Sequence, residues 1–279
     1  MTHKRSAVLA AMALTLLAVP SISRAQGVPS DGVLRGFQPS GDYVLVVNGK
    51  PIPGAEVYEN IQLPAFLVIT SALPSPVLLT PRAGSVETVH IMKVAKQKDG
   101  TVDLLADAVL APIGQFQMEG DNVLFTYEGR KVSLNPKPAL TGLHPAADLK
   151  AHNPQYVRSA SIYKPNPAAI ASLKKEPNPV TVRVVFGSWC PHCRQHVPYI
   201  LRVEDELKGS KIRFEYLGLP KPPDAWKDPE VKRLGVKGVP TGIVYVNGRE
   251  VGRIVGEAWN APEVLLNKIV YGPAVKGGK

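Results

Sequence analysis

The chain contains only two cysteines, and both lie in the segment Trp189-Cys190-Pro191-His192-Cys193. Because no other thiol is present, the two sulfurs either form a disulfide with each other or bind a ligand together. The Pro-His pair between them favours reversible disulfide chemistry over a purely structural bridge. The segment is therefore the first candidate for an active site.

A strand and a helix are predicted on either side of this segment. Residues 180–186 form a nearly continuous apolar, β-branched run that only Arg183 interrupts, which is typical of a strand buried on both faces. Residues 191–207 carry mostly apolar side chains at spacings of three and four, which predicts a helix. The cysteines then lie where the strand ends and the helix begins.

This position has a chemical consequence for Cys190. Unpaired backbone N–H groups and the helix dipole favour a thiolate at a helix N-terminus, and can lower a thiol pKa from ~8.5 to roughly 3.5–7.5. We expect Cys190 to be an exposed nucleophile and Cys193, one turn later on the same face, to be the resolving thiol. Pro191 suits the first helical turn because it lacks an N–H. His192 can add positive charge or a hydrogen bond near the sulfur.

The rest of the C-terminal part alternates between strands and helices. Asn166 followed by Pro167 predicts a helix start. The further elements expected are a strand at 212–219, a short helix at 229–234, a hairpin of 243–246 with 251–255, and a closing helix at 262–271. The order β-α-β-α-β-β-α predicts a mixed parallel and antiparallel sheet with helices on both faces.

Residues 167–279 resemble the thioredoxin superfamily in three landmarks. These are the Cys190-Pro191-His192-Cys193 motif, Pro198 eight residues after Cys190, and the loop Gly238-Val239-Pro240-Thr241 before the hairpin. The resemblance implies an α/β thioredoxin-like domain that has a central mixed sheet flanked by helices and acts on protein thiols and disulfides.

The resemblance also implies roles for the residues around the cysteines. It implies a cis peptide bond before Pro240, with Val239, Pro240 and Thr241 shaping a groove where an extended client peptide pairs as an added strand. Trp189 would either line that groove or serve packing. No cofactor and no metal are implied.

The direction of electron flow is less constrained by the sequence. A Pro-His spacer resembles the periplasmic disulfide-oxidase branch, so oxidation of clients is favoured over their reduction. Thioredoxins usually carry a buried acid six residues before the first cysteine, and here that residue is Val184. Only 46 residues separate Cys193 from Pro240, which leaves no room for the helical insertion of the monomeric periplasmic oxidases. The domain therefore looks closer to plain thioredoxin or to the membrane-tethered thiol reductases of cytochrome maturation.

Three other readings of the pair remain open. Cys190 and Cys193 could bind copper or zinc with His192 or His196, although a closed zinc site needs four ligands. The pair could be a structural disulfide in a binding module. Isomerases of the same superfamily join an N-terminal dimerisation domain to a C-terminal catalytic one, so a homodimeric isomerase is the main alternative. Covalent haem attachment would need a histidine where Arg194 stands.

The first 25 residues predict a secretory signal peptide. Lys4 and Arg5 precede an apolar run at 7–19, and Ser23-Arg24-Ala25 suits a signal peptidase. An uncleaved N-terminal anchor is the alternative. Cleavage would lower the formal net charge from +10 to +7. A periplasmic or secreted location agrees with a disulfide, which persists outside the reducing cytosol. No later segment predicts a transmembrane helix, and no nucleic-acid-binding pattern appears.

Between the signal and the thioredoxin-like part, three further segments are expected. Residues 26–41 read as a flexible lead-in, 42–136 as a β-rich domain forming a small sandwich or barrel, and 137–166 as a Pro-rich connector with limited structure. The β-rich domain could bind clients, mediate dimerisation, or dock to an unidentified redox partner in the cell envelope.

Overall fold

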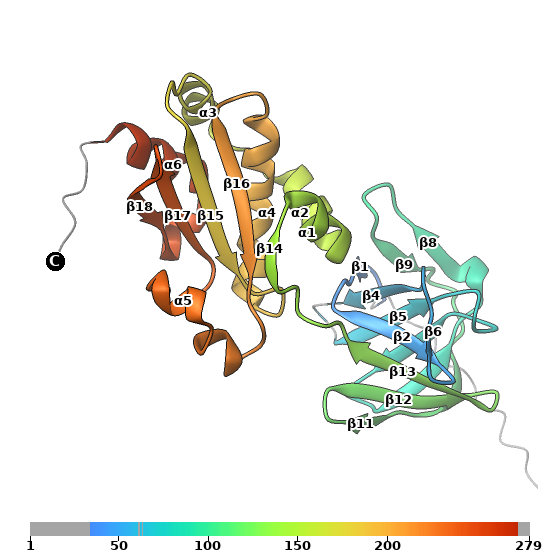
Figure 1. The fold of residues 1–279 in the computed structure, drawn as a ribbon. Helices are drawn as coiled ribbons and strands as arrows, with labels where there is room; N and C mark the ends of the chain where they lie inside the picture. Colours follow the sequence, from blue (N-terminus) through green and yellow to red (C-terminus); the bar gives the residue numbers. More distant parts are fainter. Residues whose placement is uncertain (1–33, 61, 63, 273–279) are drawn as a thin grey trace, which may run out of the picture.

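The structure is a computed structural model that describes residues 34–60, 62 and 64–272. It consists of a β-rich N-terminal domain and an α/β C-terminal domain (Figure 1). The predicted signal peptide, 1–25, and residues 26–33 of the expected lead-in lie outside the described residues. No helix among the described residues combines the length and the apolar character that crossing a membrane requires.

The C-terminal domain is built on a five-stranded mixed sheet. In spatial order its strands are β14 (Gly142–His144), β16 (Ile212–Gly218), β15 (Val180–Phe186), β17 (Thr241–Val246) and β18 (Arg249–Ile254). β15 and β16 run parallel, and the other neighbours run antiparallel. The predicted mixed sheet is thereby confirmed, and β15 coincides with the strand predicted before the cysteines.

Helices cover both faces of this sheet. They are α1 (Ala146–His152), α2 (Pro154–Ile162), α3 (Pro167–Leu173), α4 (Pro191–Glu206), α5 (Pro229–Arg233) and α6 (Pro262–Tyr271), with short 3-10 helices η2 (Asp224–Trp226) and η3 (Gly256–Asn260). Val182 and Val184 of β15 pack in one buried cluster with α1 to α4 and α6, whereas Val185 packs with α5 on the other face. Arg183 shares the α5 face, where Glu215 and Glu230 pair with its guanidinium at 2.8 and 3.2 Å.

The expectation of limited structure in 137–166 was wrong. This segment contains β14, which pairs with β16, and both α1 and α2, which pack into the C-terminal domain. Two of its prolines lie at helix starts instead of breaking helices: Pro145 precedes α1, and Pro154 is the first residue of α2. Asn153 caps α2, since its side-chain oxygen accepts a hydrogen bond from the Gln155 N–H at 2.9 Å.

The N-terminal domain is a sandwich of two antiparallel sheets. The sequence predicted either a sandwich or a barrel. The first sheet runs β1 (Gln38–Pro39), β4 (Glu56–Asn60), β5 (Ala65–Ile69), β6 (Val77–Thr80), β7 (Ser85–Thr88), β10 (Ala111–Gln115). The second runs β11 (Gln117–Glu119), β12 (Asn122–Tyr127), β13 (Arg130–Pro136), β2 (Tyr43–Val47), β3 (Lys50–Pro51). Their facing side chains form one apolar core. A separate pair, β8 (Val94–Lys96) and β9 (Val102–Leu104), follows η1 (Ile91–Lys93).

The flexible lead-in is also corrected where the structure describes it. Phe37 is fully buried against the first sheet, and its backbone exchanges two hydrogen bonds of 2.9 Å with Val102. Residues 34–41 therefore belong to the N-terminal domain. The aromatic ring of Phe37 packs in a buried cluster with side chains of the first sheet and of β9.

The two domains meet along α1 and α2, which lie between them in Figure 1. Lys137 Nζ donates a 2.6 Å hydrogen bond to the carbonyl of His152, at the end of α1. Asp42 forms an ion pair with Arg194 on α4. The N-terminal domain is thus attached next to the helix that carries the cysteines.

A glycine at this interface leads to a prediction. A Cβ at Gly41 would lie 2.7 Å from the Cα of Asn153, which is backbone and cannot turn aside. We expect Gly41→Ala to lower the free energy of unfolding by about 1–3 kcal/mol, the usual cost of overpacking. Gly238→Ala is the matched control, because a Cβ there would meet nothing within 4 Å. Urea unfolding of both variants is the measurement, and equal stabilities would contradict this account of the interface.

Candidate functional site

Cys190 and Cys193 lie at the start of α4, as predicted. Cys190 is the N-cap residue, with φ −84° and ψ 123°, and Pro191 and His192 begin the first turn. The Cys193 sulfur accepts a 3.4 Å hydrogen bond from the Gly187 N–H. Both thiols are free, so the structure corresponds to the reduced form.

The expected exposure of the nucleophile is corrected by the structure. Cys190 exposes only 7% of its surface and Cys193 none. The carbonyl of Val239 accepts a hydrogen bond from the Cys190 thiol at 3.7 Å, so the loop before β17 lies directly against this sulfur. The Val239 carbonyl therefore covers one side of the Cys190 sulfur.

The two thiols have opposite acidities. A hydrogen bond from the Cys193 thiol, together with the backbone N–H groups of Cys193 and His192 and the nearby charge of His192, lowers the pKa of Cys190 to about 6 despite its burial. Burial raises the pKa of Cys193 far above its usual range, and hydrogen bonding to Cys190 raises it further. One sulfur is thus prepared as a thiolate, and the other is held as a thiol beside it.

The loop of Val239, Pro240 and Thr241 is fixed by polar contacts on both sides. The peptide bond between Val239 and Pro240 is cis. Thr241 is buried, and its hydroxyl donates to the Gly238 carbonyl at 2.7 Å. The indole N–H of Trp259 donates to the Pro240 carbonyl at 2.9 Å.

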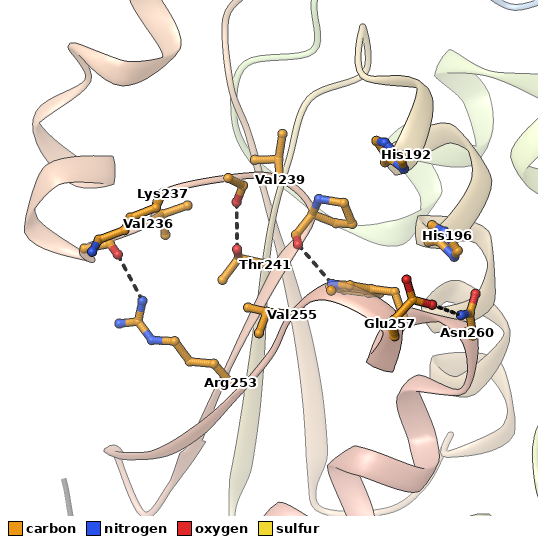
Figure 2. A pocket seen from close by; sticks show the side chains of 15 residues that line it. His192, His196, Val236, Lys237, Val239, Thr241, Arg253, Val255, Glu257 and Asn260 are labelled. Atoms are coloured by element: carbon orange, nitrogen blue, oxygen red, sulfur yellow. Dashed lines mark hydrogen bonds between the residues drawn. The ribbon is translucent and has the colours of Figure 1, made fainter. Parts of the chain in front are cut away.

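A groove of about 610 Å³ runs beside this loop. Figure 2 shows His192 and His196 of α4 on one side and Val239 and Thr241 on the other. Burial lowers the pKa of His196, and the charge of His192 lowers it further. The predicted residues His192, Val239, Pro240 and Thr241 all line the groove, whereas the η3 residues Glu257, Trp259 and Asn260 were missed because η3 carries no motif.

The sequence left open whether Trp189 lines the groove or packs in the core, and in the structure it packs in the core. Its indole N–H donates to the carbonyls of Leu219 and Pro220, at 3.0 and 2.9 Å, and its ring packs against both clusters of the C-terminal core. Trp189 does not line the groove beside Pro240. It borders a second cavity of about 290 Å³ between the domains, which Asp42, Lys137 and Arg194 also line.

The metal alternative needs at least a third ligand grouped with the two cysteines. Across residues 34–272, leaving out the undescribed 61 and 63, no three His, Cys, Asp or Glu side chains are grouped so that they could hold a metal ion. The chemistry that this arrangement can perform is thiol–disulfide exchange, with a stabilised thiolate at Cys190 and a second thiol one turn away.

The bond between Trp259 and the loop leads to a second prediction. Trp259 is 1% exposed, so Trp259→Phe would leave the Pro240 carbonyl without its indole donor. We expect a loss of about 1–3 kcal/mol in the free energy of unfolding. Trp226→Phe is the matched control, because Trp226 is 38% exposed and surface substitutions usually change stability by less than about 0.5 kcal/mol. Thermal unfolding of both variants checks this, and similar losses would contradict it.

Comparison with known proteins agrees with this geometry. The family model Thioredoxin matches residues 170–269. A Dictyostelium discoideum protein that is named as a thioredoxin is 33% identical over 100 residues, which cover 36% of this chain and 89% of that protein.

Solved structures of thioredoxins are also similar to part of the chain. Thioredoxin f2 of Chlamydomonas reinhardtii is 18% identical, covering 37% of this chain and 89% of its own, with a TM-score of 0.27. Thioredoxin O2 of Arabidopsis thaliana, in its oxidised state, is 19% identical, covering 36% of this chain and 83% of its own, also with a TM-score of 0.27. On the family model and the Dictyostelium relative, the chain belongs to the thioredoxin superfamily through its C-terminal domain.

Proposed function

We propose that this protein is an exported thiol–disulfide oxidoreductase that acts on protein cysteines through a reversible disulfide between Cys190 and Cys193. Membership of the thioredoxin superfamily supports this class of activity in general. The observation that carries the proposal is the placement of Cys190 at the N-terminus of α4, with Cys193 one turn later and the Val239 carbonyl against the Cys190 sulfur. It provides a nucleophile at neutral pH and a resolving thiol in reach.

Donation of disulfides to clients is the favoured direction. A pKa of about 6 at Cys190 means that the reduced form is stabilised as a thiolate at neutral pH. Stabilising the reduced form makes the disulfide a stronger oxidant. Val184 is fully buried at the position where thioredoxins usually carry an acid, so no carboxylate there assists the fast deprotonation of Cys193 that a reductase needs.

The client would bind in the groove beside Pro240. Cys190 does not itself line the groove, but Val239 does, and its carbonyl contacts the Cys190 sulfur; an extended peptide bound along this loop would therefore bring its own sulfur toward Cys190. Partners of the protein would therefore be unfolded or partly folded chains that carry thiols, together with an envelope redox protein that restores the disulfide.

Two assays with purified protein separate oxidant from reductant. In the first, the protein oxidises a reduced, unfolded client that has several cysteines, with glutathione disulfide as the terminal oxidant. In the second, it reduces insulin, with dithiothreitol as the terminal reductant. We expect faster turnover in the first assay and loss of both activities in Cys190→Ser. Faster insulin reduction would contradict the favoured direction, and no turnover in either assay would contradict the function.

Export is proposed from residues 1–25 and is tested separately. Expression of the full chain in a Gram-negative host, followed by cell fractionation, should recover the protein in the periplasm with Gln26 as its first residue. Recovery in the cytosol with Lys4 and Arg5 still present would contradict it.

A further inference from the structure

The structure contains a buried tyrosine hydroxyl with no evident structural purpose. Tyr156, on α2, is 1% exposed, and among the described residues no hydrogen-bond partner reaches its hydroxyl. Buried tyrosine hydroxyls usually find a partner, because an unpaired polar group in a core is costly. A phenylalanine would fill the same space without this cost.

The surroundings of Tyr156 connect it to the two cysteines. α2 packs against α4, and Tyr156 belongs to the same buried cluster as Cys190, Cys193 and Val184. Burial raises the pKa of Tyr156, and the charges of Cys193 and then Cys190 raise it further, so the two sulfurs act electrostatically on this hydroxyl. The hydroxyl therefore keeps its proton at neutral pH, and can donate a hydrogen bond but cannot act as a base.

Thiol–disulfide exchange requires a negative charge at Cys193, where the structure provides little to stabilise it. Cys193 is fully buried, and the Gly187 N–H at 3.4 Å is the donor that reaches its sulfur among the described residues. Val184, in the same cluster, carries no polar atom in its side chain. A thiolate at this position needs a second donor.

We propose that the Tyr156 hydroxyl donates a hydrogen bond to the Cys193 sulfur whenever that sulfur becomes a thiolate. The inference rests on the proposed function, and it adds a residue from outside the segment that matches the family model. In the reduced form the hydroxyl makes no hydrogen bond to this sulfur, so the bond would form when the negative charge appears and attracts the O–H. The unpaired hydroxyl destabilises the reduced protein, and its hydrogen bond to the Cys193 thiolate offsets this cost during exchange.

The step that Tyr156 would assist is the same in both directions of exchange. When a client thiolate attacks the Cys190 sulfur of the oxidised protein, a mixed disulfide forms, the Cys190–Cys193 bond breaks, and its electron pair leaves on Cys193. A second client thiolate then attacks the client sulfur of the mixed disulfide and releases Cys190 as a thiolate. The client becomes a disulfide, the protein becomes a dithiol, and one proton from solvent neutralises Cys193. In reverse, Cys193 loses that proton and attacks Cys190.

The test is Tyr156→Phe, which keeps the ring and removes the hydroxyl. We measure single-turnover reaction of the oxidised protein with a reduced peptide that contains two cysteines, over a range of pH, together with thermal unfolding. We expect exchange to slow about ten- to hundredfold, the range that corresponds to loss of one hydrogen bond to a charged group. The reverse step, attack by Cys193 on a preformed mixed disulfide, should require higher pH in the variant. The reduced variant should unfold at an equal or higher temperature, because an unpaired polar group has been removed.

Tyr163→Phe is the matched control. Its hydroxyl donates to Glu263 at 2.7 Å, away from the sulfurs, so we expect unchanged exchange rates in this variant. If the wild-type protein exchanges readily and Tyr156→Phe matches it in rate and pH profile, this inference is wrong and the proposed function stands. A lower unfolding temperature with an unchanged pH profile would also overturn it, since Tyr156 would then be structural. If the wild-type protein itself fails to exchange, the proposed function fails first.

Discussion

Cys190→Ser is expected to abolish thiol–disulfide exchange and leave the fold intact. Serine lacks a sulfur that can form the mixed disulfide, so we expect a loss of at least about a thousandfold in client oxidation, to the uncatalysed rate. The substitution is nearly isosteric, and the reduced protein contains no bond between the two sulfurs that the fold could depend on. Turnover of a reduced client measures the loss of exchange, and circular dichroism measures whether the fold is intact.

Cys193→Ser serves as the comparison for this variant. It keeps the nucleophile but cannot resolve the intermediate, so it should accumulate mixed disulfides with clients that are visible on non-reducing gels. If Cys190→Ser instead keeps activity, or loses its secondary structure, then Cys190 is not the attacking group and the pair has a structural role.

The second large effect concerns the pH dependence of Cys190. With a pKa of about 6, Cys190 is a thiolate above that pH, and its alkylation by iodoacetamide should rise through pH 6 and then level off. At pH 5 about one-tenth of such thiols are ionised, against roughly three in ten thousand for a free cysteine of pKa ~8.5. A low-pKa thiolate is intrinsically less reactive, which reduces the advantage to about ten- to thirtyfold. Mass spectrometry should locate the label on Cys190 alone, because Cys193 has no exposed surface and its raised pKa keeps it protonated.

The same shift determines how the stability of the reduced protein depends on pH. The pKa of Cys190 is lower in the folded chain than in the unfolded one, so the folded state gains stability where the thiolate exists. This gain is complete above ~8.5, the pKa of the unfolded thiol, and is lost as the pH falls through about 6. Cys190→Ser should remove this pH dependence. An alkylation midpoint near 8.5, with flat stability between pH 5 and 9, would contradict the lowered pKa.

The parts of the site that could be predicted from the sequence are those with local signals. The apolar run at 180–186 and the periodic segment after it correspond to β15 and α4, and they place both cysteines at the helix start. Asn247-Gly248 forms the turn of the hairpin predicted between 243–246 and 251–255, with left-handed φ values of 50° and 77° that favour these residue types. Such signals lie within a few neighbouring residues, and tertiary contacts do not override them here.

The helices of 137–166 were missed, because the prolines of this segment resemble helix breakers. Asn153-Pro154 repeats the cap and first-turn pattern of Asn166-Pro167, and both asparagine side chains accept hydrogen bonds from the first turn of their helix. This Asn-Pro pattern would have allowed α2, which contains the buried Tyr156, to be predicted from the sequence. The acidity of Cys193 was not, since it depends on burial by elements that are distant along the chain.

Contacts between the domains also lay beyond the sequence. Asp42 and Arg194 are far apart in the chain, and neither belongs to a motif. Their ion pair nevertheless connects the N-terminal sandwich to α4. The position of the N-terminal domain next to the cysteines therefore had to come from the structure.

The most direct test of the central claim is equilibration of the purified protein with mixtures of reduced and oxidised glutathione, followed by acid quenching and mass spectrometry of the Cys190–Cys193 peptide. We expect one reversible disulfide, with a reduction potential above the roughly −270 mV of thioredoxin and toward the roughly −120 mV of the strongest disulfide donors. A potential at or below the thioredoxin value would show that the Cys190 thiolate is not stabilised enough to make an oxidant. A protein whose two sulfurs exchange with no thiol at all would contradict the account.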